Sequence, residues 1–394
     1  MGGSERSERG GPISDFDRVV DRRGSDSLKW NKYAGRDILP LWVADMDFAA
    51  PPAVLDALRR RIDHGVFGYG QPWPSLAEAV QEHCRREYGW AIAAEWIVWL
   101  PGLVTGLHVA SRAVGQAGDA VFTATPVYPP FLSAPVQSGR RLVAAPLVLD
   151  EGRWGWDFAA VAEVMKREQP KLWQLCHPHN PVGRAWREEE LREILRLAEK
   201  HDVVVCSDEI HCDLMLDSRR HIPFASLGAE AARRSITLMA PSKTFNIPGL
   251  GCAFALIPDA RLRRDFRSAM HGIVPHVNTL GLVACEAAYR DCGDWRAGAA
   301  DYLRANRDRV AAAIAAMPGL AMAPVEATYL AWIDARGLGA DHPQRFFEQA
   351  GVGLSDGADF GLAGEGEGFV RLNFGCPRAT LDAALARMAR ALDQ

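Results

Sequence analysis

The run Ala240-Pro-Ser-Lys-Thr-Phe-Asn-Ile-Pro-Gly-Leu-Gly251 contains one lysine, Lys243, placed just after an apolar segment of strand length. Two other polar side chains, Asp208 and Asn180, follow apolar segments in the same way. Open parallel sheets bind their ligands beyond the carboxyl ends of their strands. We therefore expect these three side chains to meet at one edge of a sheet.

Short apolar runs alternate with longer helical patterns in the central third of the chain. The expected strands are residues 119–125, 141–145, 171–176, 203–207, 235–240 and 251–257. Between the third and fourth of them, Leu191, Ile194 and Ala198 recur at helical spacing and predict a helix over residues 188–200. This alternation predicts an α/β fold with a mostly parallel central sheet and helices on both faces.

The last third of the chain has a different character and is expected to form a smaller α+β domain. Its expected helices are residues 294–317 and 379–392, and its expected strands are residues 328–333 and 369–374. The segment 16–48 is expected to join them, because 394 residues exceed the usual size of one core. The predicted organisation is a flexible tail (1–13), a large domain (49–285) and a discontinuous small domain (14–48 and 286–394).

The composition excludes several classes of function. A net charge of −4 provides no basic field for nucleic acid or for an anionic membrane, and no apolar stretch is long enough to span a bilayer. The first dozen residues lack an apolar core, so we expect no secretory signal. The eight cysteines form no CxxC pair, which indicates reduced thiols and a cytoplasmic protein.

Lys243, Asp208 and Asn180 are the three groups that a pyridoxal phosphate (PLP) site needs. A desolvated lysine has a lowered pKa and can form an imine with the cofactor. The aspartate would keep the pyridine nitrogen protonated, and the asparagine would hydrogen-bond the ring hydroxyl. Each residue also has a structural interpretation, as a surface lysine, a helix cap and a turn residue. The combination favours the cofactor site.

Further residues can complete such a site. Tyr128 follows an expected strand and can either cover a flat ring or close the core. His211 can reach the polar edge of the ring, support Asp208, or be a core histidine. The run 101–106 opens an expected helix whose free backbone N–H groups can hold a phosphate, and Ser242 can add a hydroxyl donor.

Arg371 lies within an expected strand and is flanked by apolar residues. A buried arginine needs a carboxylate, which is either an internal acidic residue or the α-carboxylate of a substrate. Arg371 lies far beyond Lys243 in the sequence, in the expected second domain, and this placement favours the substrate carboxylate as its partner. His177 and His179 have no third ligand at a recognisable spacing, so we expect no metal site.

These residues resemble the aminotransferase class I/II family, which has PLP fold type I, from about Phe16 to the C-terminus. The resemblance narrows to the MalY/PatB-type cystathionine β-lyase group. Its most specific motif is Trp42-Val-Ala-Asp-Met-Asp-Phe48. The other matching segments are residues 29–30, 64–69, 207–211, 242–248 and 370–373.

The resemblance implies a role for each matching residue. Lys243 would be the Schiff-base lysine, Asp208 the partner of the ring nitrogen and Asn180 the ring-hydroxyl donor. Arg371 would hold the substrate carboxylate. The remaining implied roles are stacking on the ring by Tyr128, phosphate binding by Gly102, Leu103, Val104 and Ser242, substrate contact by the backbone of Val43 and Ala44, and binding of the neighbouring subunit's phosphate by Tyr69, which implies a homodimer.

The activity that the resemblance implies is carbon–sulfur β-elimination, with Lys243 as the general base. Cystathionine, cysteine or a cysteine S-conjugate would be converted to a thiol, pyruvate and ammonia. Three alternatives stay open. They are an aminotransferase, a decarboxylation-linked processing of a cysteine conjugate, which Arg371 disfavours, and a regulatory binding protein that retains the fold.

Overall fold

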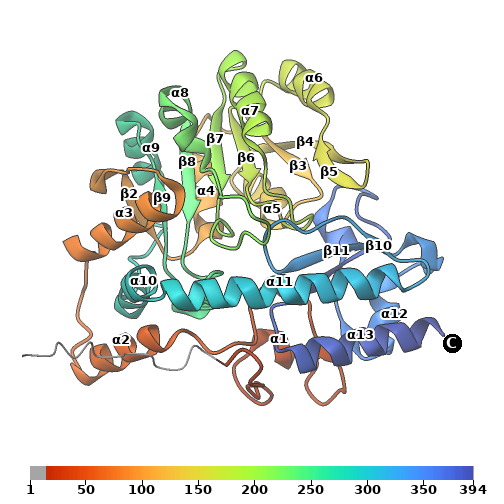
Figure 1. The fold of residues 1–394 in the computed structure, drawn as a ribbon. Coiled ribbons are helices and arrows are strands. Elements are labelled where there is room, and N and C mark those ends of the chain that lie inside the picture. The colour runs from red at the N-terminus through yellow and green to blue at the C-terminus, as the bar shows by residue number, and fades with distance from the viewer. Residues whose placement is uncertain (1–14, 394) are drawn as a thin grey trace, which may run out of the picture.

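The computed structural model describes residues 15–393, most of which surround an eight-stranded sheet (Figure 1). Its strand order is β2-β9-β8-β7-β6-β3-β4-β5. The five strands from β8 to β4 pair in parallel, and β2, β5 and β9 join antiparallel. The bounds are β2 (Ile97–Leu100), β3 (Ala120–Thr125), β4 (Arg141–Asp150), β5 (Arg153–Trp156), β6 (Leu172–Cys176), β7 (Val204–Asp208), β8 (Ser235–Met239) and β9 (Ala253–Leu256). The mostly parallel sheet is confirmed.

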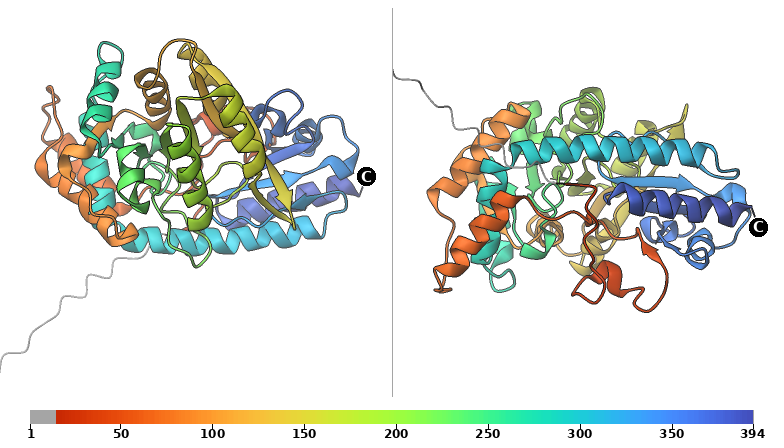
Figure 2. Two further views of the ribbon diagram at one scale, coloured as in Figure 1. Left: turned by 90° about the horizontal axis from the view of Figure 1, so that it is seen from above. Right: turned by 60° about the horizontal axis from the view of Figure 1, so that its bottom comes forward.

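Helices cover both faces of this sheet, so its strands are apolar on both sides. Adjacent residues of β3, Val121 and Phe122, belong to two separate hydrophobic cores. Helices of the first core are α4 (Leu103–Ala113), α5 (Pro130–Gln137) and α9 (Ala260–Met270). Helices of the second are α6 (Phe158–Glu168), α7 (Glu188–Lys200) and α8 (Ala229–Arg233). Figure 2 shows the sheet between these helices.

The hairpin of β4 and β5 differs from the sequence prediction, which ended the first strand at Ala145 and did not include the second. From Ala145 to Val148 the burial of β4 alternates, and Leu149 and Asp150 are exposed, because only one side of this edge is covered. Glu151 and Gly152 turn the chain with φ of 46° and 75°. A half-exposed edge strand carries a weaker apolar signal than a strand buried on both faces.

A four-stranded sheet of order β10-β11-β14-β13 occupies the last third of the chain, and all its pairings are antiparallel. The segment before residue 49 pairs with the last third of the chain through β1, which forms a separate two-stranded parallel sheet with β12. The strands are β1 (Leu39–Pro40), β10 (Ala321–Met322), β11 (Leu330–Asp334), β12 (Val352–Gly353), β13 (Ser355–Asp356) and β14 (Phe369–Asn373). The long helices α11 (Gly293–Ala315) and α13 (Arg378–Leu392) lie side by side in Figure 1.

The remaining helices are α1 (Leu28–Asn31), α2 (Pro52–Asp63), α3 (Pro74–Tyr88), α10 (Thr279–Asp291), α12 (Pro343–Gln349) and five 3₁₀ turns, Ala94–Trp96, Phe224–Leu227, Pro248–Leu250, Arg336–Leu338 and Gly357–Phe360. Helices α2 and α3 both pack against α10. The predicted domain boundaries stay a prediction, and the predicted tail lies outside the described residues. Within residues 15–393, no helix combines the length and apolar character needed to cross a bilayer.

Candidate active site

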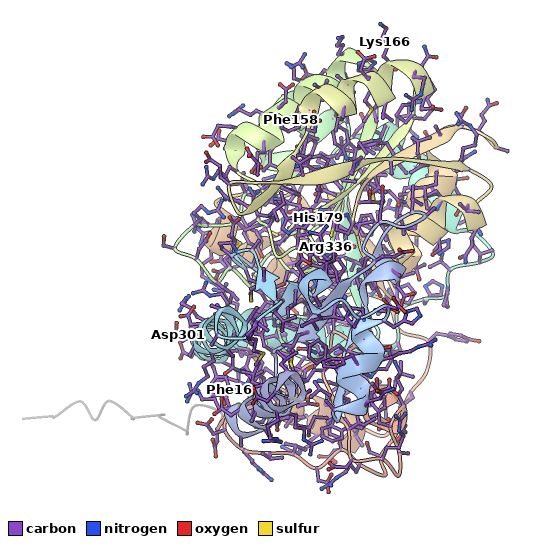
Figure 3. The ribbon with its side chains drawn as sticks, turned by 90° about the vertical axis from the view of Figure 1, so that its right-hand side faces the viewer. Phe16, Phe158, Lys166, His179, Asp301 and Arg336 are labelled. Carbon is purple, nitrogen blue, oxygen red and sulfur yellow. The ribbon has the colours of Figure 1, made fainter. Side chains whose placement is uncertain are left out.

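The carboxyl ends of three adjacent strands, β6, β7 and β8, bring the predicted polar residues together. Asn180 lies beyond β6, Asp208 is the last residue of β7, and Lys243 lies beyond β8. In the side view of Figure 3, His179 next to Asn180 lies near the middle of the molecule, toward the part that carries Arg336. The strand ends therefore face the region between the two sheets.

A cavity of about 220 Å³ opens at these strand ends. Every sequence-predicted site residue except Tyr69 lines it, namely Val43, Ala44, Gly102, Leu103, Val104, Tyr128, Asn180, Asp208, His211, Ser242, Lys243 and Arg371. Tyr69 instead lines a separate hollow together with residues 275–280, and its side chain is fully exposed.

Lys243 reaches across the cavity from the large sheet to the N-terminal segment. Its Nζ donates a hydrogen bond to the carbonyl oxygen of Ala44. Burial lowers the pKa of Lys243 to about 8, which Arg371 reinforces and the carboxylates of Asp45 and Asp208 oppose. A substantial fraction of the amine is therefore neutral, and thus nucleophilic, near neutral pH.

Asp208 is a buried carboxylate without a counter-ion. Its Oδ1 accepts a hydrogen bond from the Ile210 amide at 3.1 Å, so the predicted turn-capping role is also present. No ion pair joins Asp208 to a cation of residues 15–393. Burial raises the pKa of Asp208 to about 7, and Lys243 opposes this only weakly. The electrostatics of the site therefore favour the binding of a cation beside Asp208.

Arg371 is a buried cation that has no carboxylate partner within the described part of the chain. Its Nη1 donates to Oδ1 of Asn180 at 3.0 Å, and its Nη2 donates to the carbonyl of Trp42 at 2.8 Å and to Oγ of Ser355 at 3.2 Å. The guanidinium lies over the ring of Phe360, 4.7 Å from its centroid. Burial lowers the pKa of Arg371 to about 10, and it remains charged. The internal acidic partner considered from the sequence is therefore not found.

Asn180 and its neighbours form a tight turn as well as part of the cavity wall. The His179 amide donates to the carbonyl of Arg184 at 2.7 Å, and the Gly183 amide donates to the carbonyl of His179 at 2.8 Å. Because Oδ1 of Asn180 already accepts from Arg371, its Nδ2 group is left as a donor. The turn and the cavity interpretations of this segment are thus compatible.

The N-terminus of α4 lines the same cavity as Asp208. Gly102 is its N-cap, and a Cβ built there would meet nothing within 4 Å. The amides of the first turn have no partner inside a helix, and they point outward with the positive end of the helix dipole. Together with the half-buried Ser242, this turn can hold an anion.

Two histidines lie at or beside the cavity, His211 in its lining and His179 next to Asn180 in the chain. The ring of His211 is buried edge-on against Tyr329 at 5.8 Å, and its Nδ1 has no partner. Burial, with Lys243 and Arg371, lowers the pKa of His211 to about 3, so it stays neutral. His179 pairs through Nε2 with the carbonyl of Pro126 at 2.8 Å. Among residues 15–393, no cluster of three His, Cys, Asp or Glu side chains has the geometry of a metal site.

Sequence reasoning missed the residues that hold the N-terminal wall of the cavity. The hydroxyl of the fully buried Tyr329 donates to the Ala44 carbonyl at 3.0 Å. Nδ2 of Asn373 donates to the carbonyls of Val43 and Asp45 at 2.6 and 2.8 Å. Both side chains belong to strand-like segments that resemble ordinary core, so no local signal distinguishes them.

Comparison with known proteins places this geometry in a family. Residues 36–388 match the family described as aminotransferase class I and II. The chain is 39% identical over 386 residues to cystathionine beta-lyase PatB of Bacillus subtilis, which covers 96% of this chain and 99% of that protein.

Two solved structures are similar over nearly their whole length. The crystal structure of OvoB has a TM-score of 0.93 and 51% identity, covering 96% of this chain and 99% of that one. Cystalysin from Treponema denticola, which contains pyridoxal 5′-phosphate, has a TM-score of 0.92 and 34% identity, covering 97% and 99%. The chain therefore belongs to the aminotransferase class I and II family and, within it, to the MalY/PatB-type group.

Proposed function

We propose that this chain is a PLP-dependent carbon–sulfur β-lyase that converts cystathionine, cysteine or a cysteine S-conjugate to a thiol, pyruvate and ammonia. The observation that carries the proposal is the buried, unpaired guanidinium of Arg371 in the same cavity as Lys243 and Asp208. A free amino acid offers the carboxylate that this cation lacks. The similarity to cystathionine beta-lyase PatB supports β-elimination as the reaction that the bound amino acid undergoes.

The residues of the cavity fit pyridoxal phosphate. Asp208 is a buried anion that would pair with a protonated ring nitrogen, and the open N-terminus of α4 at Gly102 would hold the phosphate. Nδ2 of Asn180 would donate to the ring hydroxyl. Tyr128 lies at the cavity wall, where its ring can cover the cofactor, and the amine of Lys243 would bind it covalently.

The mechanism assigns a task to each of these side chains. When bound, pyridoxal phosphate supplies a carbonyl that condenses with amines and a ring that accepts electrons from the α-carbon. Arg371 would hold the substrate carboxylate by two parallel hydrogen bonds. Once the substrate amine has replaced it, Lys243 would remove the α-proton, which its lowered pKa permits. The electron pair left on the α-carbon would form a Cα–Cβ double bond as the Cβ–S bond breaks and the thiolate leaves, and water would hydrolyse the released enamine to pyruvate and ammonia.

The reaction is tested by mixing the PLP-loaded protein with L-cystathionine and, separately, with an S-alkyl cysteine. Thiol and pyruvate are expected in equal amounts from at least one of them. An aminotransferase would release no thiol and would accumulate the pyridoxamine form of the cofactor, and that result would overturn the proposal. Substrate turnover by the protein without any release of pyruvate would equally contradict β-elimination.

Replacing Asp208 with asparagine is expected to stabilise the cofactor-free protein and weaken cofactor binding. The pKa of this carboxyl is about 7 in the folded chain, against an ordinary value of 3.8. The cost of ionising it therefore grows as the pH rises from about 4 to 7, and stability falls over that range. Asp208→Asn should raise the thermal midpoint of the cofactor-free protein at pH 8, and not at pH 4.

The same variant should bind pyridoxal phosphate roughly 30-fold or more weakly, because the ring nitrogen loses its anion. Asp202→Asn is the matched control, since Asp202 is 97% exposed and its φ of 51° suits asparagine. An unchanged cofactor affinity in Asp208→Asn would contradict the assigned role.

We also propose a cytoplasmic homodimer in which Tyr69 reaches the phosphate of the neighbouring site. Tyr69 does not line the cavity of its own chain, and it stands exposed beside Val66 and Phe67, which are also exposed. An exposed apolar cluster of this kind is typical of a protein interface.

Mixed dimers of Tyr69→Ala and Lys243→Ala chains test this arrangement. Each variant alone should be nearly inactive, but one site of every mixed dimer combines an intact Lys243 with an intact Tyr69. Refolding an equal mixture should restore about a quarter of the wild-type activity, because half of the dimers are mixed and one of their two sites is intact. The absence of any recovery would show that Tyr69 acts within its own chain, and full activity of the Tyr69→Ala protein alone would show that Tyr69 does not act at all.

A further inference from the structure

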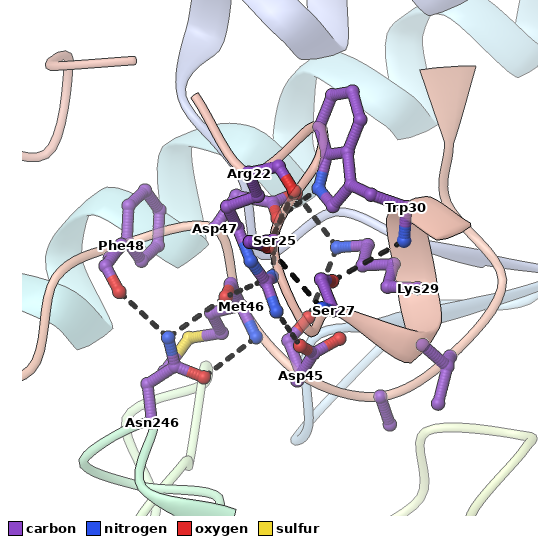
Figure 4. A network of polar contacts seen from close by, with 12 residues as sticks. Arg22, Ser25, Ser27, Lys29, Trp30, Asp45, Met46, Asp47, Phe48 and Asn246 are labelled. Carbon is purple, nitrogen blue, oxygen red and sulfur yellow. Dashed lines mark hydrogen bonds and ion pairs between the residues drawn. The ribbon is translucent and has the colours of Figure 1, made fainter. Parts of the chain in front are cut away.

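Val43 and Ala44 of the loop Trp42–Phe48 line the cavity, and side chains from distant segments hold this loop in place (Figure 4). Asn246, three residues after Lys243, accepts from the Met46 amide at 2.9 Å and donates to the carbonyl oxygens of Met46 and Phe48 at 2.8 and 2.7 Å. The loop is therefore tied directly to the segment that carries the lysine.

Two carboxylates of this loop have different surroundings. Asp47 accepts from Nζ of Lys29 at 2.8 Å, from Nε1 of Trp30 at 3.0 Å and from Nη1 of Arg22 at 2.7 Å. Both of its oxygens are satisfied, as a structural ion pair requires.

Asp45 is only half satisfied. Its Oδ2 accepts from Nη2 of Arg22 at 2.6 Å, whereas its Oδ1 is buried and has no hydrogen-bond partner. A buried polar atom without a partner costs free energy, and such atoms concentrate at functional sites. The adjacent Ala44 carbonyl accepts from Lys243, so the half-satisfied carboxylate lies one residue from the contact of the lysine.

The charges facing Lys243 come from several elements. Asp208 at the end of β7 and Asp45 in the loop are anions, and Arg371 in β14 is a cation. His211 is neutral, and burial keeps the phenols of Tyr128 and Tyr329 protonated. Of the charged groups, Asp45 acts most strongly on Lys243, more than Asp208 does. Asp45 itself faces Arg22 and the ammonium of Lys29, which donates to the Asp45 carbonyl at 3.1 Å.

We propose that Asp45 and Arg22 form a positioning pair for Lys243, in which Asp45 attracts the freed amine to the Ala44 carbonyl and Arg22 limits that attraction by neutralising the carboxylate. The inference rests on the proposed function, because a lysine released from the cofactor by substrate needs a fixed place from which to reach the α-proton. The pair explains why an arginine near the N-terminus contacts this loop. The two residues act through Lys243 and touch neither cofactor nor substrate.

Opposite effects of two neutral substitutions test the pair. Asp45→Asn removes an anion near Lys243 and should make the lysine more acidic. Arg22→Gln leaves Asp45 uncompensated and should make it less acidic. Each change is expected to move the titration by about half a pH unit, which is about threefold in the neutral amine at pH 7.

Two measurements report this titration. The first is the pH dependence of the visible absorbance of the PLP-loaded protein, which follows the proton on the Lys243 nitrogen bound to the cofactor and should shift in the same direction. The second is the rate at which the cofactor-free protein recaptures pyridoxal phosphate between pH 6 and 10, which follows the free amine. Recapture at pH 7 should be about threefold faster for Asp45→Asn and about threefold slower for Arg22→Gln. The difference should vanish well above pH 9, where the amine is neutral in every variant.

Control variants separate charge from structure. Asp45→Glu keeps the anion and should titrate near the wild type, and Asp21→Asn changes an exposed charge of the same segment and should have no effect. Shifts of Asp45→Asn and Arg22→Gln in the same direction, or no shift in either, would overturn the inference. If the Asp45→Asn protein does not fold, the direction in which Arg22→Gln shifts the Lys243 titration decides whether the inference stands. The proposed function would fall separately, if a Lys243→Ala protein kept the visible band.

Discussion

Lys243→Ala protein is expected to lack the visible absorbance band of the cofactor and to lose kcat/KM by about 10⁴-fold or more. Two roles are lost together, since this amine would hold the cofactor and would remove the α-proton. The pKa of about 8 that burial produces suits both roles, because the neutral amine is accessible near neutral pH. Alanine leaves no nearby group to replace it, since His211 is buried and its pKa is about 3.

The measurement is an absorbance spectrum of the purified variant incubated with pyridoxal phosphate, followed by assays of thiol and pyruvate release. Lys166→Ala is the control, because Lys166 is an exposed lysine of α6 that lies at the top of Figure 3, well away from His179. A visible band that persists in the Lys243→Ala protein, and that borohydride abolishes by reducing an imine on another lysine, would remove Lys243 from its assigned role.

Arg371→Ala is expected to weaken the binding of amino-acid substrates by roughly 10²–10³-fold, with a much smaller effect on pyridoxal phosphate. The guanidinium is a buried cation in the cavity without an acidic partner among residues 15–393, so a substrate carboxylate would satisfy it by two charge-assisted hydrogen bonds. Some loss of cofactor affinity is expected as well, because Oδ1 of Asn180 loses its donor in the variant.

The two effects are distinguished by titrating the variant with pyridoxal phosphate and then titrating the loaded protein with an amino acid. Arg371→Lys retains the charge but not the planar fork, and it should fall between wild type and alanine. Arg336→Ala, which removes an exposed arginine paired with Asp334 after β11, should change neither affinity. Equal losses of cofactor and substrate binding in Arg371→Ala would identify a structural arginine.

The strands that carry the site could be predicted closely because they are buried on both faces. Strands β3, β6 and β8 consist entirely of buried residues, and polar or turn residues mark their ends. The helix over residues 188–200 has the predicted bounds, because its apolar stripe is regular and its first turn begins with three glutamates. Strand β5 was not predicted, since Arg153 to Trp156 are only partly covered and form strand only as partners of β4.

Local motifs also predicted which kinds of side chain form the site. Lys243, Asp208 and Asn180 each follow an apolar run, and a parallel sheet necessarily aligns such positions. Tyr329 and Asn373 could not be recognised, because their contacts with Ala44 and Asp45 join segments almost 300 residues apart or more.

The sequence by itself determined the buried strands that carry the site, the residue types gathered at their ends and the family, because these depend on local periodicity and on short motifs. Only the tertiary structure decided which charges find partners. Asp47 is fully satisfied, whereas Asp45, Asp208 and Arg371 are not, and this difference arises from distances between residues remote in sequence. Burial makes this difference matter at Asp208 and Arg371, because a group that is buried in a cavity without an ion pair has a shifted pKa and favours a ligand of opposite charge.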